Sequence, residues 1–190
     1  MSFNANPAVL DVAREIILDH DNVRDLFERF KVAANVEEKV IIANTLIREI
    51  AIHSDAEEMS LYDYMGNYGL GQSAAHNREE HAEVKQLVYV ALDAQVDRPD
   101  FEEIITRAVT TFLQHSQEEE TQQLPQLVAA LTPDQNDALA REFLGARIKV
   151  PSRLHPVEPE PELQESFHSK ITDAMWNRQF TNVKFAHPEL

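Results

Sequence analysis

The chain of 190 residues is long enough for one domain with a buried core, and it carries a formal net charge of −16 with no cysteine. The acidic balance argues against nucleic acid and anionic membranes as partners, because phosphate groups are bound by clustered Lys and Arg. The lack of cysteine excludes disulfides, thiolate zinc sites and cysteine-held iron–sulfur clusters, so any metal must be bound by His, Asp and Glu.

The amino-terminal stretch MSFNANPAVLDVAREIIL has no basic residues ahead of its apolar ones. No apolar run in the chain approaches the roughly 18 residues that a membrane span requires. We therefore expect neither a secretory leader nor a spanning helix, and predict a cytoplasmic protein.

Apolar residues recur at helical spacing along most of the chain, and the alternation typical of strands does not occur. Four long helices are predicted, over residues 7–33, 36–65, 73–95 and 100–130. The segment GNYGLG, residues 66–71, holds three of the four glycines and separates the second helix from the third. Thr132 and Pro133 provide an N-cap and a first-turn proline, and predict a shorter helix that ends near residue 148.

Four prolines between Pro151 and Pro161 end this helical pattern. We therefore divide the chain into an all-α domain, residues 1–148, and a Pro-rich segment with a carboxy-terminal tail, residues 149–190. The tail is expected to regain a helix near residues 162–176. A lid over the domain and a solvated linker remain alternative roles for it.

The first two predicted helices repeat in the second two. His20 and His81 lie 61 residues apart, and each follows an acidic residue and precedes Val, a basic residue and Leu at matching distances. His53 and His115 lie 62 residues apart, and each precedes Ser and a Glu-Glu pair four and five positions on. A duplicated helical hairpin folds naturally into an up-down-up-down four-helix bundle, in which the repeated polar residues face each other across the centre.

Residues four apart on a helix share one face, so His53 with Glu57 presents an imidazole and a carboxylate to one point, and the second copy repeats this pair. Imidazole and carboxylate together suit iron or manganese, and a carboxylate has two oxygens with which to bridge two ions. Burying such carboxylates without metal would be strongly unfavourable. The sequence thus predicts a dinuclear metal site with the ligands His20, His53, Glu57, His81, His115 and Glu119.

These residues stand in four motifs: the His of LDHDNVRDLF, the HxxxEE of HSDAEEMSLY, the Glu-His of REEHAEVKQL and the HxxxEE of HSQEEETQQLP. With them the chain, over about residues 8–130, resembles the hemerythrin-like family, also called the HHE cation-binding domain. The resemblance implies a non-haem di-iron centre that binds O2, reacts with peroxide, or senses iron or oxygen. It implies His20 and His53 mainly on one iron, His81 and His115 mainly on the other, and Glu57 and Glu119 as bridges.

Oxygen-carrying members of that family have a further His one helical turn before the position of His81, where this chain has Asn77. The adjacent His76 lies five residues before His81, which turns it about 140° away on a helix, although it stays a candidate for an extra ligand. The second iron is therefore expected to lack one nitrogen ligand, with water, Asn77 or Glu80 in its place. An open or labile position favours reaction over reversible oxygen storage.

Other polar residues are expected to lie away from the metal. Glu58 and Glu120, which follow the bridging candidates, are interpreted as solvated or capping acids. Tyr62 and Tyr64 are expected to reach the rim of the site. The histidines outside the repeat are not expected to contact metal: His155, His168 and His187.

The leading functional prediction is an oxidoreductase with two iron ions that reacts with O2 or peroxide. Manganese is the alternative metal, and a small organic substrate is an option. The main rival is a non-catalytic oxygen or iron sensor, carrier or iron store whose tail meets a partner. A third interpretation is a metal-free helical interaction protein with an acidic surface. The sequence assigns no catalytic residue and no oligomeric state.

Overall fold

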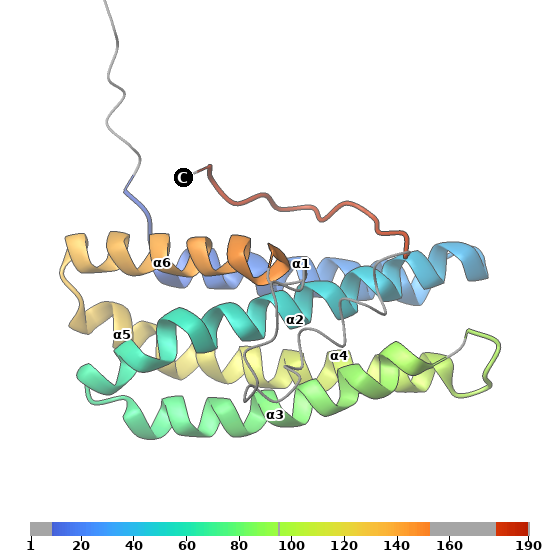
Figure 1. Cartoon of the computed structure of the whole chain (residues 1–190), viewed down its shortest axis with the longest axis horizontal. Coiled ribbons are helices and arrows are strands. Elements are labelled where there is room, and N and C mark those ends of the chain that lie inside the picture. Colours follow the sequence, from blue (N-terminus) through green and yellow to red (C-terminus); the bar gives the residue numbers. More distant parts are fainter. Residues whose placement is uncertain (1–8, 95, 153–177, 190) are drawn as a thin grey trace, which may run out of the picture.

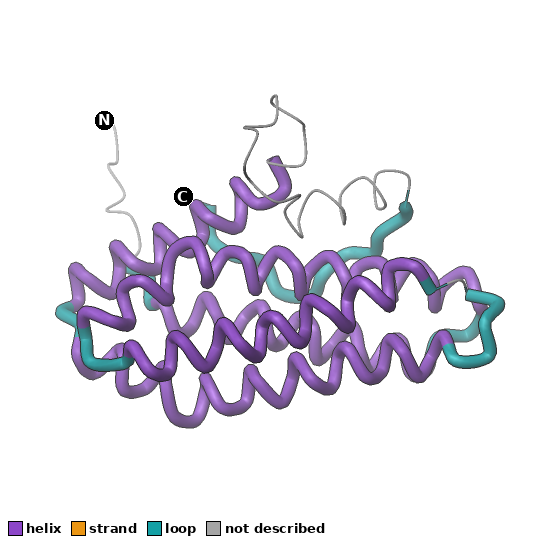
Figure 2. Tube along the Cα trace, turned by 60° about the horizontal axis from the view of Figure 1, so that its bottom comes forward, coloured by secondary structure: helices purple, strands orange, loops and turns teal. Residues whose placement is uncertain are grey.

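The computed structural model describes residues 9–94, 96–152 and 178–189. Over these residues the chain is helical, without strands, and it ends in an extended segment (Figures 1 and 2). The helices are α1 Val12–Val32, α2 Val36–Asn67, α3 Gly71–Asp93, α4 Phe101–Glu118, α5 Leu124–Ala130 and α6 Pro133–Ser152. A π-helical turn, η1 Glu119–Gln123, joins α4 to α5.

Helices α1 to α4 form the bundle. Each packs against the next in the chain, and α1 also packs against α4, which closes the four into one unit (Figure 1). The predicted all-α, up-down-up-down four-helix bundle is confirmed. α6 lies outside the four, against α1 and α2. No helix in the described ranges combines the length and the apolar character needed to cross a bilayer.

Side-chain N-caps determine the first residues of α1 and α2. α1 begins at Val12, not at residue 7, because the Asp11 carboxylate accepts a hydrogen bond from the Arg14 N–H at 2.9 Å and caps the helix there. α2 begins at the predicted residue, where the Asn35 side chain accepts from the backbone N–H three positions on, also at 2.9 Å.

The predicted helix over residues 100–130 is not continuous. Pro125 has no N–H for the carbonyl of Thr121, and its ring crowds that carbonyl, so the turn before it widens into η1. The π turn begins at Glu119, one of the predicted ligands. Such turns recur at functional sites because they change which side chains face inward.

α6 belongs to the packed domain and is longer than predicted. It extends to Ser152 rather than ending near residue 148, and Leu139, Phe143 and Leu144 are buried in the core. The predicted helix over residues 162–176 lies outside the described residues. The Pro-rich segment also lies outside them from residue 153 onward, after the end of α6.

Two apolar clusters fill the interior, one on each side of a polar layer. The cluster nearer the α1–α2 connection includes Val23, Phe30 and Phe112, and the other includes Ile16 and Phe143. The six predicted ligands form the layer between the clusters, and none is more than 2% exposed. The fold therefore holds these polar side chains in a dry environment, between tightly packed apolar walls.

Phe143→Ala is expected to destabilise the protein by about 3–5 kcal/mol, because it empties a fully buried aromatic site on α6. The melting temperature should fall by about 6–20 °C, measured by circular dichroism during heating. Ile148→Ala on the same helix, where the side chain is 66% exposed, should change stability by less than about 0.5 kcal/mol. Equally small effects would mean that α6 does not unfold with the bundle.

Candidate metal centre

Four histidines, one from each helix of the bundle, converge in the polar layer. Nε2 of His20 lies 3.1 Å from Nε2 of His53, and Nε2 of His81 lies 3.0 Å from Nε2 of His115. The structure thus brings the histidines together in the two pairs that the family resemblance implies. Each pair joins neighbouring helices of one hairpin, α1 with α2 and α3 with α4.

Glu57 and Glu119 connect the two histidine pairs. Glu57 Oε2 lies 3.4 Å from His53 Nε2 and 3.5 Å from His81 Nε2. Glu119 Oε2 makes the corresponding contacts with the remaining histidine of each pair, at 3.4 and 3.7 Å. Each carboxylate therefore reaches one histidine of each pair, which is the arrangement that a bridging ligand requires.

The other ring nitrogen of every histidine faces a carboxylate. The Nδ1 to carboxylate distances are 2.7 Å for His20 and Glu120, 3.2 Å for His53 and Asp19, 3.2 Å for His81 and Glu58, and 2.7 Å for His115 and Glu80. A nitrogen that donates to a carboxylate must carry the hydrogen, so Nε2 of each neutral ring directs its lone pair into the layer. Glu58 and Glu120 therefore orient histidines, which corrects the prediction that they are solvated or capping acids.

The repeat also supplies the bases that hold two of these carboxylates. Arg24 donates to Glu120 at 2.6 Å, and Lys85 donates to Glu58 at 2.7 Å. Arg24 and Lys85 are the basic residues of the duplicated acid–His–base pattern. Each copy of the pattern thus supplies three groups. They are a predicted ligand, the acid that orients the histidine of the neighbouring helix, and the base that pairs with an orienting acid from the other copy.

Asp19 has two partners that no sequence pattern indicates. Arg147 Nε of α6 lies 2.7 Å from Asp19 Oδ2, and His187 Nε2 lies 2.7 Å from Asp19 Oδ1. Both residues lie outside the duplicated helices. His187, which is predicted from the sequence to lie away from the metal, contacts Asp19, the acid that orients His53.

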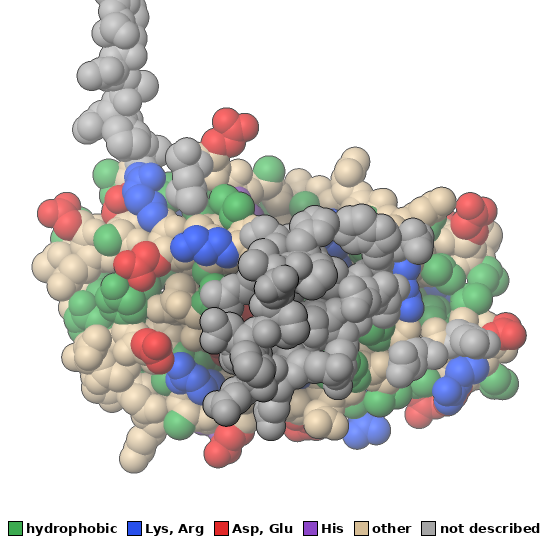
Figure 3. All heavy atoms as spheres, in the orientation of Figure 1, with side chains coloured by type: hydrophobic (Ala, Val, Ile, Leu, Met, Phe, Trp, Pro, Cys, Tyr) green, Lys and Arg blue, Asp and Glu red, His purple; other side chains and the backbone are tan. Residues whose placement is uncertain are grey.

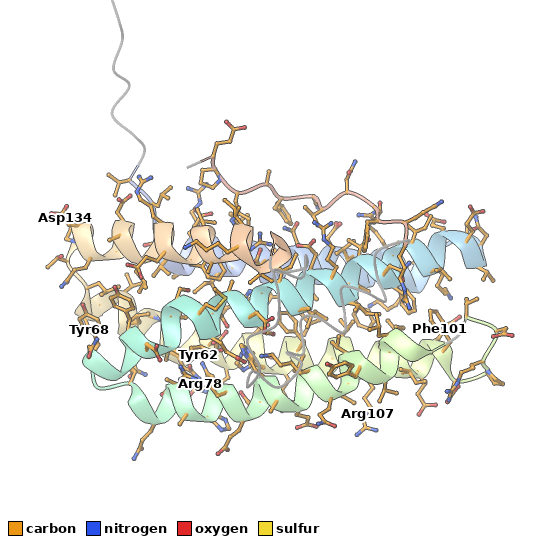
Figure 4. The ribbon with its side chains drawn as sticks, viewed as in Figure 1. Tyr62, Tyr68, Arg78, Phe101, Arg107 and Asp134 are labelled. Atoms are coloured by element: carbon orange, nitrogen blue, oxygen red, sulfur yellow. The ribbon has the colours of Figure 1, made fainter. Side chains whose placement is uncertain are left out.

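Tyr62 lies inside the layer rather than at its rim. In Figure 4 Tyr62 lies between α2 and α3. Its hydroxyl is 3.0 Å from His81 Nε2, and it donates to Glu57 at 2.9 Å. The side chain is 1% exposed. Burial, together with the nearby Glu119 and Glu57, raises the pKa of Tyr62 well above its ordinary value, so the phenol keeps its proton.

Asn77 points into the layer, whereas His76 does not. Asn77 Nδ2 donates to Glu119 Oε1 at 2.8 Å and pairs with the Gln123 amide through hydrogen bonds of 2.7 and 2.9 Å. His76 is 51% exposed, and its Nε2 lies 3.5 Å from Glu80 Oε1 at the surface. Of the predicted substitutes for the missing histidine, Asn77 thus reaches the layer, and Glu80 orients a histidine instead.

The buried charged groups of the layer favour the binding of a cation. Burial, reinforced by the charge of Glu57, raises the pKa of Glu119 well above its ordinary value. Burial would also raise the pKa of Glu57, but the neighbouring His53 lowers it to about 2. Burial would lower the pKa of His53, but Glu57 and Asp19 raise it to about 10. Two carboxylates buried beside each other thus favour a positive charge between them.

The atoms of the layer fit metal ions. Glu57 Oε1 and Glu119 Oε2 are buried and have no hydrogen-bond partner in the described part of the chain, which is costly unless another ligand binds them. One group of donor atoms, from His20, His53, Glu57 and Glu119, lies within 4.8 Å of one another. A second group, from Glu57, His81 and His115, does the same. Imidazole and carboxylate donors suit divalent first-row metals.

Comparison with known proteins agrees with this geometry. The chain is 25% identical, over 152 residues, to an uncharacterized hemerythrin-like protein of Schizosaccharomyces pombe (strain 972 / ATCC 24843), covering 78% of this chain and 74% of the relative. It is 23% identical over 146 residues to a DNA nickase of Nostoc sp. (strain PCC 7120 / SAG 25.82 / UTEX 2576), covering 76% of this chain but only 41% of that protein.

No solved structure matches the chain significantly. The sequence profile of the hemerythrin HHE cation-binding domain matches residues 11–128, which include all four motifs and every residue of the two donor groups. The chain therefore belongs to the hemerythrin HHE cation-binding domain family, whose helical domains bind metal ions, usually iron.

Proposed function

We propose that this chain binds two iron ions in the polar layer and reacts there with O2 or peroxide. The observation that carries the proposal is the position one helical turn before His81, where Asn77 presents an amide rather than an imidazole and hydrogen-bonds to Glu119 and Gln123. A position with fewer protein ligands is where an exogenous small molecule binds. When bound, two irons would supply the electrons for reducing O2 or peroxide.

The side chains beside the three-residue group would position such a molecule. Tyr62 keeps its proton, and its hydroxyl lies 3.0 Å from His81 Nε2, so it would donate a hydrogen bond to an oxygen atom at that position. The Asn77–Gln123 amide pair fixes Glu119 from the same side. Because the predicted ligands are at most 2% exposed, a diatomic molecule or peroxide suits the layer better than an organic substrate.

Nucleic acid and membranes are not among the partners we propose. The net charge is −16, and on the face in Figure 3 the Lys and Arg side chains are scattered among Asp and Glu rather than gathered in a patch. The likeness to a DNA nickase extends over less than half of that protein, so its activity is not transferred. We propose the cytoplasm as the location and manganese as the alternative metal.

The test begins with metal-free protein loaded with Fe2+ under argon. We expect about two irons per chain by elemental analysis, followed by repeated consumption of added hydrogen peroxide or O2 when an excess of ascorbate is supplied as the external reductant that returns the irons to Fe2+. One ion per chain, or a preference for zinc, would exclude the di-iron proposal. Two irons that oxidise once and do not turn over would favour the non-catalytic sensor, carrier or storage function.

Asn77→His should slow peroxide consumption by about tenfold or more, because the added imidazole would occupy the place left to exogenous ligands. The new ring must displace the Gln123 amide, which pairs with Asn77 at 2.7 and 2.9 Å. Steady-state peroxide assays on iron-loaded protein measure the effect.

Two matched variants show whether ligand filling is the cause. Gln123→Ala opens the same corner without adding a ligand, so it should not reproduce the slow rate. His76→Ala changes an exposed residue and should stay within about twofold of the parent. A parent-like rate in Asn77→His, together with loss of an iron in His76→Ala, would make His76 the ligand and contradict the proposed site.

A further inference from the structure

The carboxy-terminal segment Arg178–Glu189 is bound along the outside of α1 and α2 (Figures 1 and 2). The Asn22 side chain makes two hydrogen bonds with the backbone of Phe185, donating to its carbonyl at 2.9 Å and accepting from its N–H at 2.8 Å. Thr45 Oγ1 accepts from the Thr181 N–H at 3.0 Å. Bonds of this kind fix the backbone of the segment in one register on the two helices.

Further bonds hold the segment at its middle. Arg29 donates to the Thr181 hydroxyl at 2.7 Å and to the Asn182 carbonyl at 3.0 Å. Arg29 lies nine residues, or about two and a half turns of α1, beyond His20, and none of the contacts of Asn22, Thr45 and Arg29 with the segment involves a predicted ligand. The segment is therefore bound by the bundle itself, independently of any metal.

The segment ends by placing His187 in a buried acidic cluster. His187 Nδ1 lies 2.9 Å from Glu15 Oε2, and its Nε2 lies 2.7 Å from Asp19 Oδ1. Arg147 of α6 reaches the other oxygen of Asp19 at 2.7 Å and Glu49 at 3.3 Å. Glu15 and Asp19 are almost fully buried. Carboxylates so deep in the protein are costly to bury unless they are paired and hydrogen-bonded, and His187 and Arg147 supply these partners.

Asp19 links this cluster to the polar layer. Its Oδ2 lies 3.2 Å from His53 Nδ1, and its side chain is 3% exposed. The acid at the equivalent place in the second half, Glu80, contacts His115 Nδ1 at 2.7 Å but is 26% exposed. Its surface neighbour His76 lies 3.5 Å away. The duplicated helices thus supply both acids, whereas His187 and Arg147, in the described part of the chain, contact the acid beside His53 and not Glu80.

We propose that the carboxy-terminal tail, through His187, positions Asp19 and thereby makes the ion at the His20–His53 pair the slowly exchanging one of the two. This rests on the proposed di-iron function. Release of an ion requires its histidines to turn away, and His53 cannot turn freely while Asp19 is held from both sides. Residues that orient a metal ligand typically change metal affinity by about 10- to 100-fold when replaced.

The test follows metal release from full-length protein loaded with Fe2+ under argon, after an excess of bipyridyl chelator is added. The parent should release its two ions in a fast and a slow phase. His187→Ala should speed the slow phase by about tenfold and leave the fast phase within about twofold. His187→Gln, which keeps one N–H donor for Asp19, should lie between the parent and His187→Ala.

Three further variants separate positioning from a general loosening of the fold. Glu80→Gln should speed the fast phase instead, which assigns that phase to the other half of the layer. Arg29→Ala weakens the bound tail at its middle and should speed only the slow phase. Lys184→Ala, in an exposed part of the same tail, should match the parent.

Unchanged release in His187→Ala, or equal acceleration of both phases, would overturn the tail proposal. An equal acceleration would show that His187 stabilises the whole domain rather than one ligand. The number of ions bound by the parent is read separately by elemental analysis. A parent with one ion per chain would end the di-iron proposal. In that case, the release rates of His187→Ala and Glu80→Gln would show whether Asp19 or Glu80 slows the release of that ion.

Discussion

Glu57→Ala is expected to lower the affinity for both ions by more than about 100-fold, beyond what replacing an orienting residue causes. The reason is that one Glu57 oxygen lies 3.4 Å from His53 Nε2 and 3.5 Å from His81 Nε2, so its loss removes a donor from both groups. Metal content after dialysis against a weak chelator measures the effect, with folding checked by circular dichroism.

Glu58→Gln is the matched control one residue further on. Glu58 contacts His81 Nδ1 and Lys85 but no other predicted ligand. Its replacement should lower the affinity for the ion at the His81–His115 pair by about 10- to 100-fold and leave the ion at the His20–His53 pair in place. Equal loss of both ions in the two variants would refute the distinction between a bridging and an orienting glutamate.

Metal loading should raise the melting temperature of the parent by about 8–16 °C for each ion bound, and Glu119→Gln should lose most of this rise. An ion present at about 1,000 times its dissociation constant contributes about 4 kcal/mol, and each kcal/mol shifts the melting temperature of a domain of this size by about 2–4 °C. Gln has nearly the shape of Glu and keeps the oxygen that accepts from Asn77 at 2.8 Å. The metal-free variant should therefore melt close to the metal-free parent.

Calorimetry of both proteins, with and without Fe2+ under argon, makes this comparison. A metal-free Glu119→Gln protein that melts far below the parent would show that Glu119 is needed for folding in its own right. A full metal-induced rise in the variant would show that Glu119 does not bind the ion.

The duplication made the core of the site predictable from sequence. The six predicted ligands meet in one layer because helical spacing and the 61- and 62-residue repeats fix both the face and the height of each side chain. The same repeat contained the orienting acids and their bases, Arg24 and Lys85 among them, but a pattern does not distinguish a solvated acid from one that holds a histidine. That distinction depends on contacts between helices from different copies.

Other features depend on interactions that no local pattern carries. Pro125 indicates a helix break, but the apolar residues around it keep helical spacing, so the sequence pattern does not indicate η1. Arg147 and His187 reach Asp19 from more than 120 residues away, and nothing in their own neighbourhoods indicates where they bind. Tyr62 reaches the layer because α2 and α3 approach closely beside His81.

The orienting acids cross between the two hairpins. Glu120, at the end of the second hairpin, holds His20 of the first, and Glu58 of the first holds His81 of the second. One hairpin alone would therefore lack the acid for its own first histidine, but two identical hairpins related by a two-fold axis would complete each other. An ancestral chain half as long would have been able to assemble this centre as a homodimer, and fusion of two copies would have left each copy free to change. Among the described residues, the tail contact at Asp19 and the Asn77–Gln123 pair have no counterpart in the other half, and such one-sided features would become available only after that fusion.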